Sequence, residues 1–439
     1  MTDFKQLLDE DISRSHSRSI LTYGVNNDSK KPKTTLLLFD LSIYGHHPAY
    51  IKYLIEYWCR HNLSGHLTIV VSEKFPQVHL DVIEFAAEKR PSDISFVAIT
   101  PAEESSLRSR HSFLSRTMRG FQEWALLQKY ARAFDPQHTL LMYFDTCGIP
   151  LAAGVKLSCS FSGIYFRPTF HYDQLPNYVP SRSSRLQKIR EQLTLTLALR
   201  NPNLENLLCL DPIAAEQLNN KGIDAVSIVH LPDPIDTTPN ASIRTATIQE
   251  KFGIDLERKV CFLFGALTQR KGIEPLLQSV LELSAEQCQQ LCFLFIGEAG
   301  EDNKRKFDEL IETVCKKKPV QIVRHYNFVP DEDISAYFDL ADLVLAPYQK
   351  HVGMSGILLW AAAHGKPLLS SDYGLMGKLV QDHTLGLVVD STQPVEIAKG
   401  LTQFLQDGLE KYCDQEKMKA FAAQNSAENF SKVIFETVL

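Results

Sequence analysis

The feature that most constrains the fold of this chain is a regular alternation of short apolar runs with amphipathic segments. Seven runs precede residue 232: "TLLLFDL" (35–41), "HLTIVVS" (66–72), "ISFVAIT" (94–100), "TLLMYFD" (139–145), "SGIYFR" (162–167), "NLLCLD" (206–211) and "VSIVHL" (226–231). Continuous apolar strands that alternate with helices are typical of a parallel sheet covered on both faces. Between the first two runs, one helical face carries Ile51, Leu54, Ile55 and Trp58.

A proline-rich stretch divides the chain into two such series. "LPDPIDTTPNASIRTA" (231–246) contains three prolines and no periodicity, which is typical of an interdomain connection. Six further apolar runs follow: "VCFLFGAL" (260–267), "CFLFIGEAG" (292–300), "VQIVRHYNFV" (320–329), "DLVLAPY" (342–348), "KPLLSSD" (366–372) and "LGLVVD" (385–390). A chain of 439 residues is also long enough for two cores.

We therefore predict the α/β class, with two doubly wound Rossmann-like domains that face a cleft. The expected parts are a turn-rich leader (1–34), a first domain (35–235) and a second domain (236–439), divided near residues 232–240. We expect the C-terminal helix to cross back to the first domain. Ligands of such sheets bind beyond the carboxyl ends of the strands, so we expect them in the cleft between the domains.

Composition excludes several classes of protein. A net charge of −6 and a pI near 6.2 argue against nucleic-acid binding. The nine cysteines show no CxxC spacing, so we expect neither a zinc site nor a disulfide framework, and a reducing, cytoplasmic compartment. The polar N-terminus has no signal-peptide core, and no run of 18 apolar residues occurs.

Three glycine-bearing loops follow strands of the second series. They contribute Gly265 with Arg270 and Lys271, then Gly297 and Gly300, then Gly353, Ser355 and Gly356. Glycines let the backbone approach a ligand, and free amides at a helix N-terminus favour a phosphate. Any α/β protein carries glycines at such turns, but three convergent loops with a basic pair indicate a phosphate site. We expect Lys271 to be a solvated residue at the end of its loop.

The first series carries fewer candidates. "YGHHPAY" (44–50) follows the first strand and offers Gly45, His46 and His47, although histidines at strand ends are often surface or capping residues. Asp145 ends another strand, where it either orients an acceptor or caps a helix. Arg167 and His171 are further candidates for contacts with an acceptor or a phosphate. "DEDIS" (331–335) resembles a metal-binding DxD, but we interpret Asp331 as a helix N-cap and expect no metal.

Two segments are locally basic in this acidic chain. Residues 105–132 hold six Arg or Lys and one Glu, and residues 182–200 hold five and one, both with interleaved apolar residues. This pattern is typical of helices at a membrane interface. The alternative is a solvated basic face over a core.

The second series resembles the donor-binding domain of GT-B glycosyltransferases, most closely glycosyltransferase family 4. The family's "GRLxxxKG" and "iGxG" correspond to "GALTQRKG" and "IGEAG" here. "HYNFVPDEDISAYFDLADLVLAP" and "GKPLLSSD" follow in the family's order and spacing within residues 260–400. The first series is similar to the acceptor domain more weakly, through "LSIYGHHPAYI" and "LPDPID".

The resemblance implies a retaining glycosyltransferase that moves a sugar from a nucleotide-sugar donor to a saccharide, lipid or small-molecule acceptor. It implies no cofactor, since the nucleotide-sugar is a co-substrate, and no metal. The implied catalytic residues are His47, Asp145 and Lys271, and His46, Arg167 and His171 would bind the acceptor. The implied donor-binding residues are Gly45, Gly265, Arg270, Lys271, Gly297, Glu298, Val329, Gly353, Met354, Ser355 and Gly356.

The chain departs from the family's pattern at two motifs. The positions of its Glu-x7-Glu motif carry Val352 and Trp360, and the arginine of "GRL" is Ala266, with Arg270 four residues later. A glycine-serine loop is typical of some branches of the family, and we expect "GMSG" (353–356) to hold the diphosphate. The loss of both glutamates leaves two alternatives open: a non-catalytic sugar-nucleotide-binding or scaffold protein, and a GT-B sugar-nucleotide epimerase.

Overall fold

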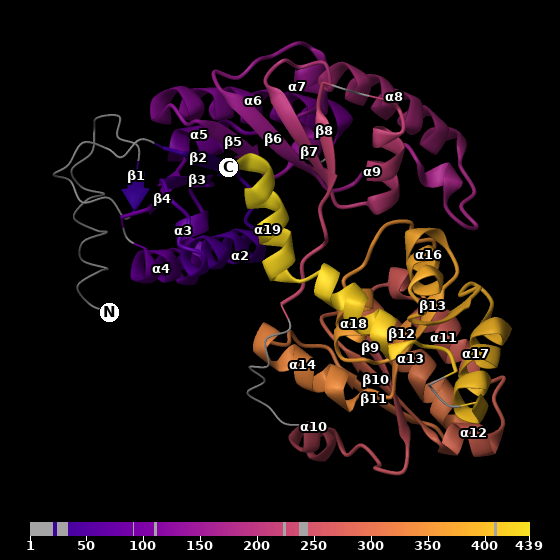
Figure 1. The fold of residues 1–439 in the computed structure, drawn as a ribbon. Coiled ribbons are helices and arrows are strands. Elements are labelled where there is room, and N and C mark those ends of the chain that lie inside the picture. The colour runs from indigo at the N-terminus through magenta and orange to yellow at the C-terminus, as the bar shows by residue number, and fades with distance from the viewer. Residues whose placement is uncertain are drawn as a thin grey trace. The chain divides into compact units, whose positions relative to one another are not determined.

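The computed structural model describes residues 21–23, 34–90, 92–108, 112–222, 225–236, 245–407 and 411–439. The described chain forms two compact units, shown in Figure 1. The first unit contains residues up to Pro168, Arg190–Leu231 and Ser431–Leu439, and the second contains Thr169–Ile189 and Pro232–Phe430. Residues 169–189 therefore belong to the second unit, although the sequence placed them inside the first domain.

The first unit is built on an eight-stranded sheet of order β1-β4-β3-β2-β5-β6-β7-β8. Its strands are β1 Leu21–Tyr23, β2 Leu36–Asp40, β3 Leu67–Val71, β4 Ile94–Ala98, β5 His138–Leu141, β6 Ser160–Tyr165, β7 Leu204–Cys209 and β8 Ser227–His230. All neighbours pair in parallel except β1, which runs antiparallel to β4. Each predicted apolar run overlaps one of the parallel strands. Strand β1 lies in the expected leader, and a three-residue edge strand held by backbone bonds leaves no pattern in the sequence.

Helices connect the strands of this sheet. They are α2 His47–Arg60, α3 Phe75–Val78, α4 Leu80–Lys89, α5 Pro101–Ser106, α6 Phe113–Phe134, η1 Phe144–Thr146, α7 Gly148–Ala152, α8 Arg182–Ala198 and α9 Pro212–Asn219. Helix α2 begins with Pro48 in its first turn, where the missing N–H costs no hydrogen bond. Its predicted apolar face is confirmed, because Ile51, Leu54, Ile55 and Trp58 are all buried.

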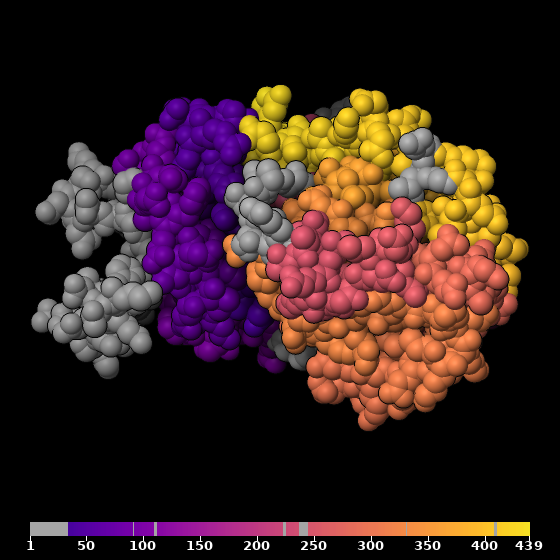
Figure 2. Space-filling view, turned by 90° about the horizontal axis from the view of Figure 1, so that it is seen from below, coloured from indigo at the N-terminus to yellow at the C-terminus, as the bar shows by residue number. Residues whose placement is uncertain are grey.

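The second unit contains a six-stranded parallel sheet of order β11-β10-β9-β12-β13-β14. The strands are β9 Lys259–Phe264, β10 Leu291–Ile296, β11 Gln321–His325, β12 Leu343–Ala346, β13 Leu368–Ser371 and β14 Gly386–Val389. The helical elements are η2 Tyr172–Gln174, α10 Thr245–Phe252, η3 Gln269–Lys271, α11 Ile273–Val280, α12 Ala285–Gln289, α13 Glu301–Lys317, α14 Asp331–Leu340, α15 Ile357–Ala363, α16 Gly374–Asp382, α17 Pro394–Asp407, α18 Gln415–Gln424 and α19 Ala427–Val438. Figure 2 shows α10, in rose, and α18, in yellow, at the surface of this unit.

The last helix, α19, ends in the first unit. Phe435 of this helix stacks on Tyr57 of α2 and meets Trp58 edge-on, with ring centroids 5.6 and 5.5 Å away. The amide of Asn206 in β7 donates to the backbone oxygen of Thr437 over 3.4 Å. The first unit therefore includes a segment from the far end of the chain.

Both sheets contain a switch in strand order. Strand β2 lies between β3 and β5, and β9 lies between β10 and β12, so the connections leave each central strand in opposite directions. Such switch points open a crevice at the carboxyl ends of the strands, where ligands of doubly wound sheets bind. Within the described part of the chain, no helix is both long and apolar enough to cross a bilayer.

Candidate functional site

At the switch point of the first unit, the end of β2 faces the start of α2. Asp40, the last residue of β2, is buried, and its Oδ2 lies 2.7 Å from Nδ1 of His47. Its Oδ1 accepts from the backbone N–H of Ser42 over 2.9 Å. Asp40 therefore fixes the orientation of the His47 ring. Sequence reasoning missed Asp40, although it lies within the first apolar run.

Aromatic rings enclose His47. Its ring stacks on Phe166 at 5.5 Å with an angle of 19° between the planes, and Tyr143 approaches its edge at 5.5 Å. The side chain retains 14% exposure. A histidine held on one nitrogen by a carboxylate and only partly exposed is suited to act at its other nitrogen.

Asp145 follows the neighbouring strand β5. It lies in η1, and its two carboxylate oxygens accept from the backbone N–H groups of Phe166 and Arg167, each over 2.9 Å. Burial raises the pKa of Asp145 from 3.8 to about 6, although the two amides act in the opposite direction. The carboxylate therefore orders the segment after β6.

A second buried carboxylate, Glu123 of α6, lies close by. Arg119 donates to Glu123 Oε1 over 2.7 Å, and the hydroxyl of Thr146 donates to Oε2 over 3.0 Å. Glu123 lines a cavity of about 20 Å³ together with Asp40, Ser42 and Thr146. Sequence analysis did not select Glu123, because a single acid within a basic helix shows no functional signal.

The other candidate residues from the first half of the sequence do not share one site. Gly45 adopts a φ of +71°, with nothing within 4 Å of an added Cβ, and His46 is exposed and stacks on Tyr50 at 6.0 Å. Arg167 is exposed in the first unit. His171 belongs to the second unit and is completely buried between Phe170 and Tyr172, so its ring has no exposed surface to offer to an acceptor.

Lys271 is the central charge at the switch point of the second unit. The side chain is only 7% exposed, so the expectation of a solvated lysine at a loop end is wrong. Its ammonium donates to the backbone oxygen of Phe264 over 2.8 Å and to the hydroxyl of Tyr348, whose ring centroid lies 4.3 Å away. The lysine is buried because η3 turns its side chain back under the end of β9.

This ammonium has spare hydrogen-bonding capacity. An ammonium has three donors, and two of them have these protein partners. Among the described residues, no carboxylate pairs with Lys271. A buried cation without a counter-ion is costly unless an anion binds beside it. The geometry around Lys271 is therefore suited to an anion.

Two glycines allow this arrangement. A Cβ on Gly265 (φ +99°) would lie 3.1 Å from Nζ of Lys271, and a Cβ on Gly297 (φ +138°) would lie 2.3 Å from the backbone oxygen of Gly265. Gly297 is thus required for the close packing of two strand ends. This requirement is independent of any ligand.

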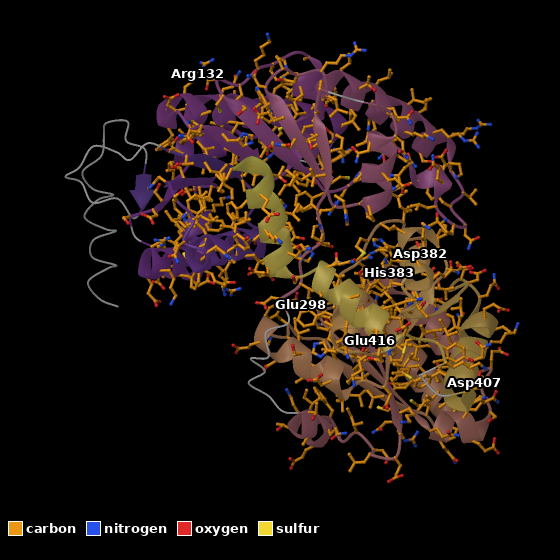
Figure 3. The ribbon with its side chains drawn as sticks, in the orientation of Figure 1. Arg132, Glu298, Asp382, His383, Asp407 and Glu416 are labelled. Carbon is orange, nitrogen blue, oxygen red and sulfur yellow. The ribbon has the colours of Figure 1, made fainter. Side chains whose placement is uncertain are left out.

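Three further donor-site candidates belong to the same unit. The guanidinium of Arg270 lies over the Tyr348 ring, 5.2 Å from its centroid, and the Arg270 backbone oxygen accepts from Gln349 over 2.8 Å. Glu298, labelled in Figure 3, is exposed, and its backbone oxygen accepts from the N–H of Leu267 over 2.7 Å. Val329 is buried after β11, which limits its side chain to packing.

The "GMSG" loop (353–356) precedes α15, as predicted. Helix α15 begins at Ile357 with Gly356 as its N-cap, and no side chain caps it. Within the described chain, no protein atom accepts a hydrogen bond from the backbone amides of residues 353–356. The hydroxyl of Ser355 lies 3.5 Å from that of Tyr348, and the backbone oxygen of Met354 lies 3.1 Å from Nε2 of His351. The loop thus offers several free donors next to the Lys271–Tyr348 pair.

The two positions of the family's glutamate motif serve structural roles. Trp360 packs in a cluster with Phe338 and His364, whose ring centroids lie 5.4 and 5.9 Å from its own and 5.6 Å from each other. The backbone oxygen of Val352 accepts from Leu375 over 2.7 Å. The Asp331 side chain lies outside the described residues, and Pro330 is the N-cap of α14. Among the described residues, no group of three His, Cys, Asp or Glu side chains is placed to hold a metal ion.

Comparison with known proteins supports the resemblance of the second unit to glycosyltransferases. Residues 244–425 match the family model for glycosyl transferases group 1. The putative glycosyltransferase YtcC of Bacillus subtilis is 25% identical over 40% of this chain and 42% of its own length. The D-inositol 3-phosphate glycosyltransferase of Corynebacterium diphtheriae is 27% identical over 39% of this chain and 40% of its own. The match therefore spans about four-tenths of these relatives.

Solved structures extend the likeness to most of the chain. Anabaena HepE in complex with UDP has a TM-score of 0.62 at 13% identity, covering 92% of this chain and 99% of its own. Sucrose-phosphate synthase from Thermosynechococcus elongatus has a TM-score of 0.64 at 13% identity, covering 92% and 98%. The protein has the GT-B fold, with two Rossmann-like domains. Its second unit resembles the glycosyl transferases of group 1 and matches their model.

Proposed function

We propose that this protein is a retaining glycosyltransferase that uses a nucleotide-sugar donor. The donor diphosphate binds at the carboxyl end of β9 and β12, on the ammonium of Lys271 and the amides of residues 353–356. The acceptor, a saccharide, a lipid-linked molecule or a small molecule, binds at the end of β2. His47 and Asp145 orient it there.

The buried ammonium of Lys271 is the observation that carries this proposal. It has no carboxylate partner in the described chain, and it lies next to the Tyr348 hydroxyl and a loop with free amides. A nucleoside diphosphate leaves with negative charge on its phosphate oxygens. Preorganised donors that face this charge lower the barrier without a metal ion.

The family match and the fold support the same function. The matched residues 244–425 include Lys271, Tyr348 and the 353–356 loop. HepE, which shares the fold, was solved in complex with UDP and glucose. We infer that the second unit binds a nucleotide sugar in the corresponding place.

The test is a turnover assay with the purified full chain. Release of nucleoside diphosphate is measured from a panel of nucleotide sugars, with and without saccharide and lipid acceptors, and NMR of the product reports the anomeric configuration. Acceptor-dependent release with retention is the expected result. Inverted product would contradict the proposed stereochemistry, and absence of both binding and release across the panel would contradict the proposal as a whole.

A non-catalytic sugar-nucleotide-binding protein is the second candidate, because of one observation. Trp360 packs against Phe338 and His364 where the family carries a glutamate. Nucleotide binding in calorimetry, without release in the presence of any acceptor, would favour this candidate. Interconversion of the donor sugar without an acceptor would favour an epimerase.

A further inference from the structure

Two helices of the first unit present large apolar side chains to solvent. On α6, Phe113, Leu114, Met118 and Phe121 are between 40% and 73% exposed. On the part of α8 that belongs to the same unit, Leu193 and Leu197 are 61% and 46% exposed. These six residues form what we call the α6–α8 face.

The α6–α8 face is continuous across the two helices. The guanidinium of Arg190 in α8 lies over the ring of Phe113 in α6, 4.5 Å from its centroid. Leu114, Met118 and Phe121 follow one another at the spacing of a single helix face, as do Leu193 and Leu197. Soluble proteins seldom expose so many large apolar side chains together without a binding partner.

The charge around this face is positive. Helix α6 and residues 190–198 of α8, which share the first unit, carry five Lys or Arg residues and two acidic residues, whereas the whole chain has a net charge of −6. Both acidic residues have partners inside the unit: Glu123 is buried against Arg119 and Thr146, and Glu191 accepts from Tyr165. The basic residues Arg116, Arg132 and Arg190 are exposed, and Figure 3 labels Arg132 at the surface of this unit.

We propose that the α6–α8 face binds the surface of a membrane rich in anionic lipids. Leucine, methionine and phenylalanine side chains enter the boundary between headgroups and acyl chains, while the arginines contact lipid phosphates. The charge favours this occupant over a second copy of the chain, because two such basic faces repel each other. The active chain would then work at a bilayer surface without spanning it.

The test is flotation of the full-length protein with vesicles of phosphatidylcholine, with and without phosphatidylglycerol. We expect binding only to the anionic vesicles, and weaker binding as salt concentration rises. Leu114→Ser combined with Leu193→Ser should reduce the vesicle affinity about tenfold or more, since two apolar side chains no longer enter the bilayer. Arg116→Gln combined with Arg190→Gln should reduce it about fivefold per residue.

Matched controls lie in the second unit. Leu256→Ser removes a leucine that is 75% exposed, and Lys316→Gln with Lys317→Gln removes two exposed charges from α13. Both controls should bind vesicles like the wild type. Unchanged binding of the leucine variant would overturn the proposal. A second result would also overturn it: the wild-type protein does not bind vesicles but forms a dimer, and the leucine variant is monomeric. The face would then bind a second copy of the chain.

Discussion

Nδ1 of His47 lies 2.7 Å from Oδ2 of Asp40, at the end of the central strand of the first unit. Asp40→Asn leaves one acceptor oxygen where the carboxylate has two, so the side chain can no longer accept from both the Ser42 amide and the His47 ring. Either one of these hydrogen bonds is lost or His47 changes tautomer to accept from the new NH₂ group. We expect the variant to lose about 0.5–1.5 kcal/mol of unfolding free energy, the usual contribution of one hydrogen bond. NMR of the ring nitrogens of His47 should report the changed tautomer.

The control for this prediction is His61→Gln, which changes an exposed histidine at the other end of α2 and leaves the Asp40 contact intact. If Asp40 positions His47 for the reaction, turnover falls in Asp40→Asn and stays near the wild-type value in the control. Equal turnover in both would mean that the pair serves stability alone.

Lys271→Met keeps much of the aliphatic stem of the side chain and removes its charge. We expect turnover to fall about 10²–10³-fold, the usual loss for one preorganised donor in a transition state. The free energy of unfolding should also change, because the backbone oxygen of Phe264 loses its donor. Calorimetry with a nucleoside diphosphate and chemical denaturation measure the two effects. Lys317→Met is the matched exposed control, and full activity in Lys271→Met would rule out the proposed role.

Glycine substitutions separate ligand contact from packing in the second unit. Gly356→Val places its Cβ where no described atom lies within 4 Å, whereas Gly297→Val places it 2.3 Å from the backbone oxygen of Gly265. We therefore expect Gly356→Val to fold normally and to bind a nucleoside diphosphate much more weakly, and Gly297→Val to be unstable. Wild-type affinity in Gly356→Val would show that the loop does not hold the diphosphate.

Ser355→Ala tests the side chain of the same loop. Its hydroxyl makes only a long contact of 3.5 Å with that of Tyr348, so folding should be unaffected. Loss of one neutral hydrogen bond to the ligand should cost about 0.5–1.5 kcal/mol of binding free energy. Calorimetry should therefore give a smaller loss than for Gly356→Val. A larger loss would place the hydroxyl, rather than the amides, at the centre of the site.

Asp145 gives the stability of the fold a specific pH dependence. Its pKa is raised by burial from 3.8 to about 6, so the folded state holds this proton more tightly than the unfolded state. The contribution of Asp145 to stability therefore decreases as the pH rises from about 4 to about 6, and is constant above that range. Urea denaturation of the wild type and of Asp145→Asn across this range should show the difference in slope. Parallel curves would mean that the carboxyl titrates normally in the folded protein.

The sequence alone determined the architecture. Continuous apolar runs at regular spacing specify buried parallel strands, because only a sheet covered on both faces buries such runs completely. Each of the thirteen predicted runs overlaps a strand of the observed sheets. Gly265, Lys271 and the 353–356 loop were selected as candidates from their places at strand ends, since the carboxyl ends of neighbouring parallel strands meet at one edge.

Tertiary structure alone decided the environment of each side chain. Lys271 reads as a surface loop residue, yet η3 returns its ammonium under β9 and against Tyr348, 77 residues later in the chain. Asp40 and Glu123 become neighbours of one cavity only because β2 and α6 pack together. His171 is drawn into the second unit by its packing. Periodicity reports which residues face a core, whereas burial and pairing of a charge depend on residues distant in sequence, and these contacts form only in the folded chain.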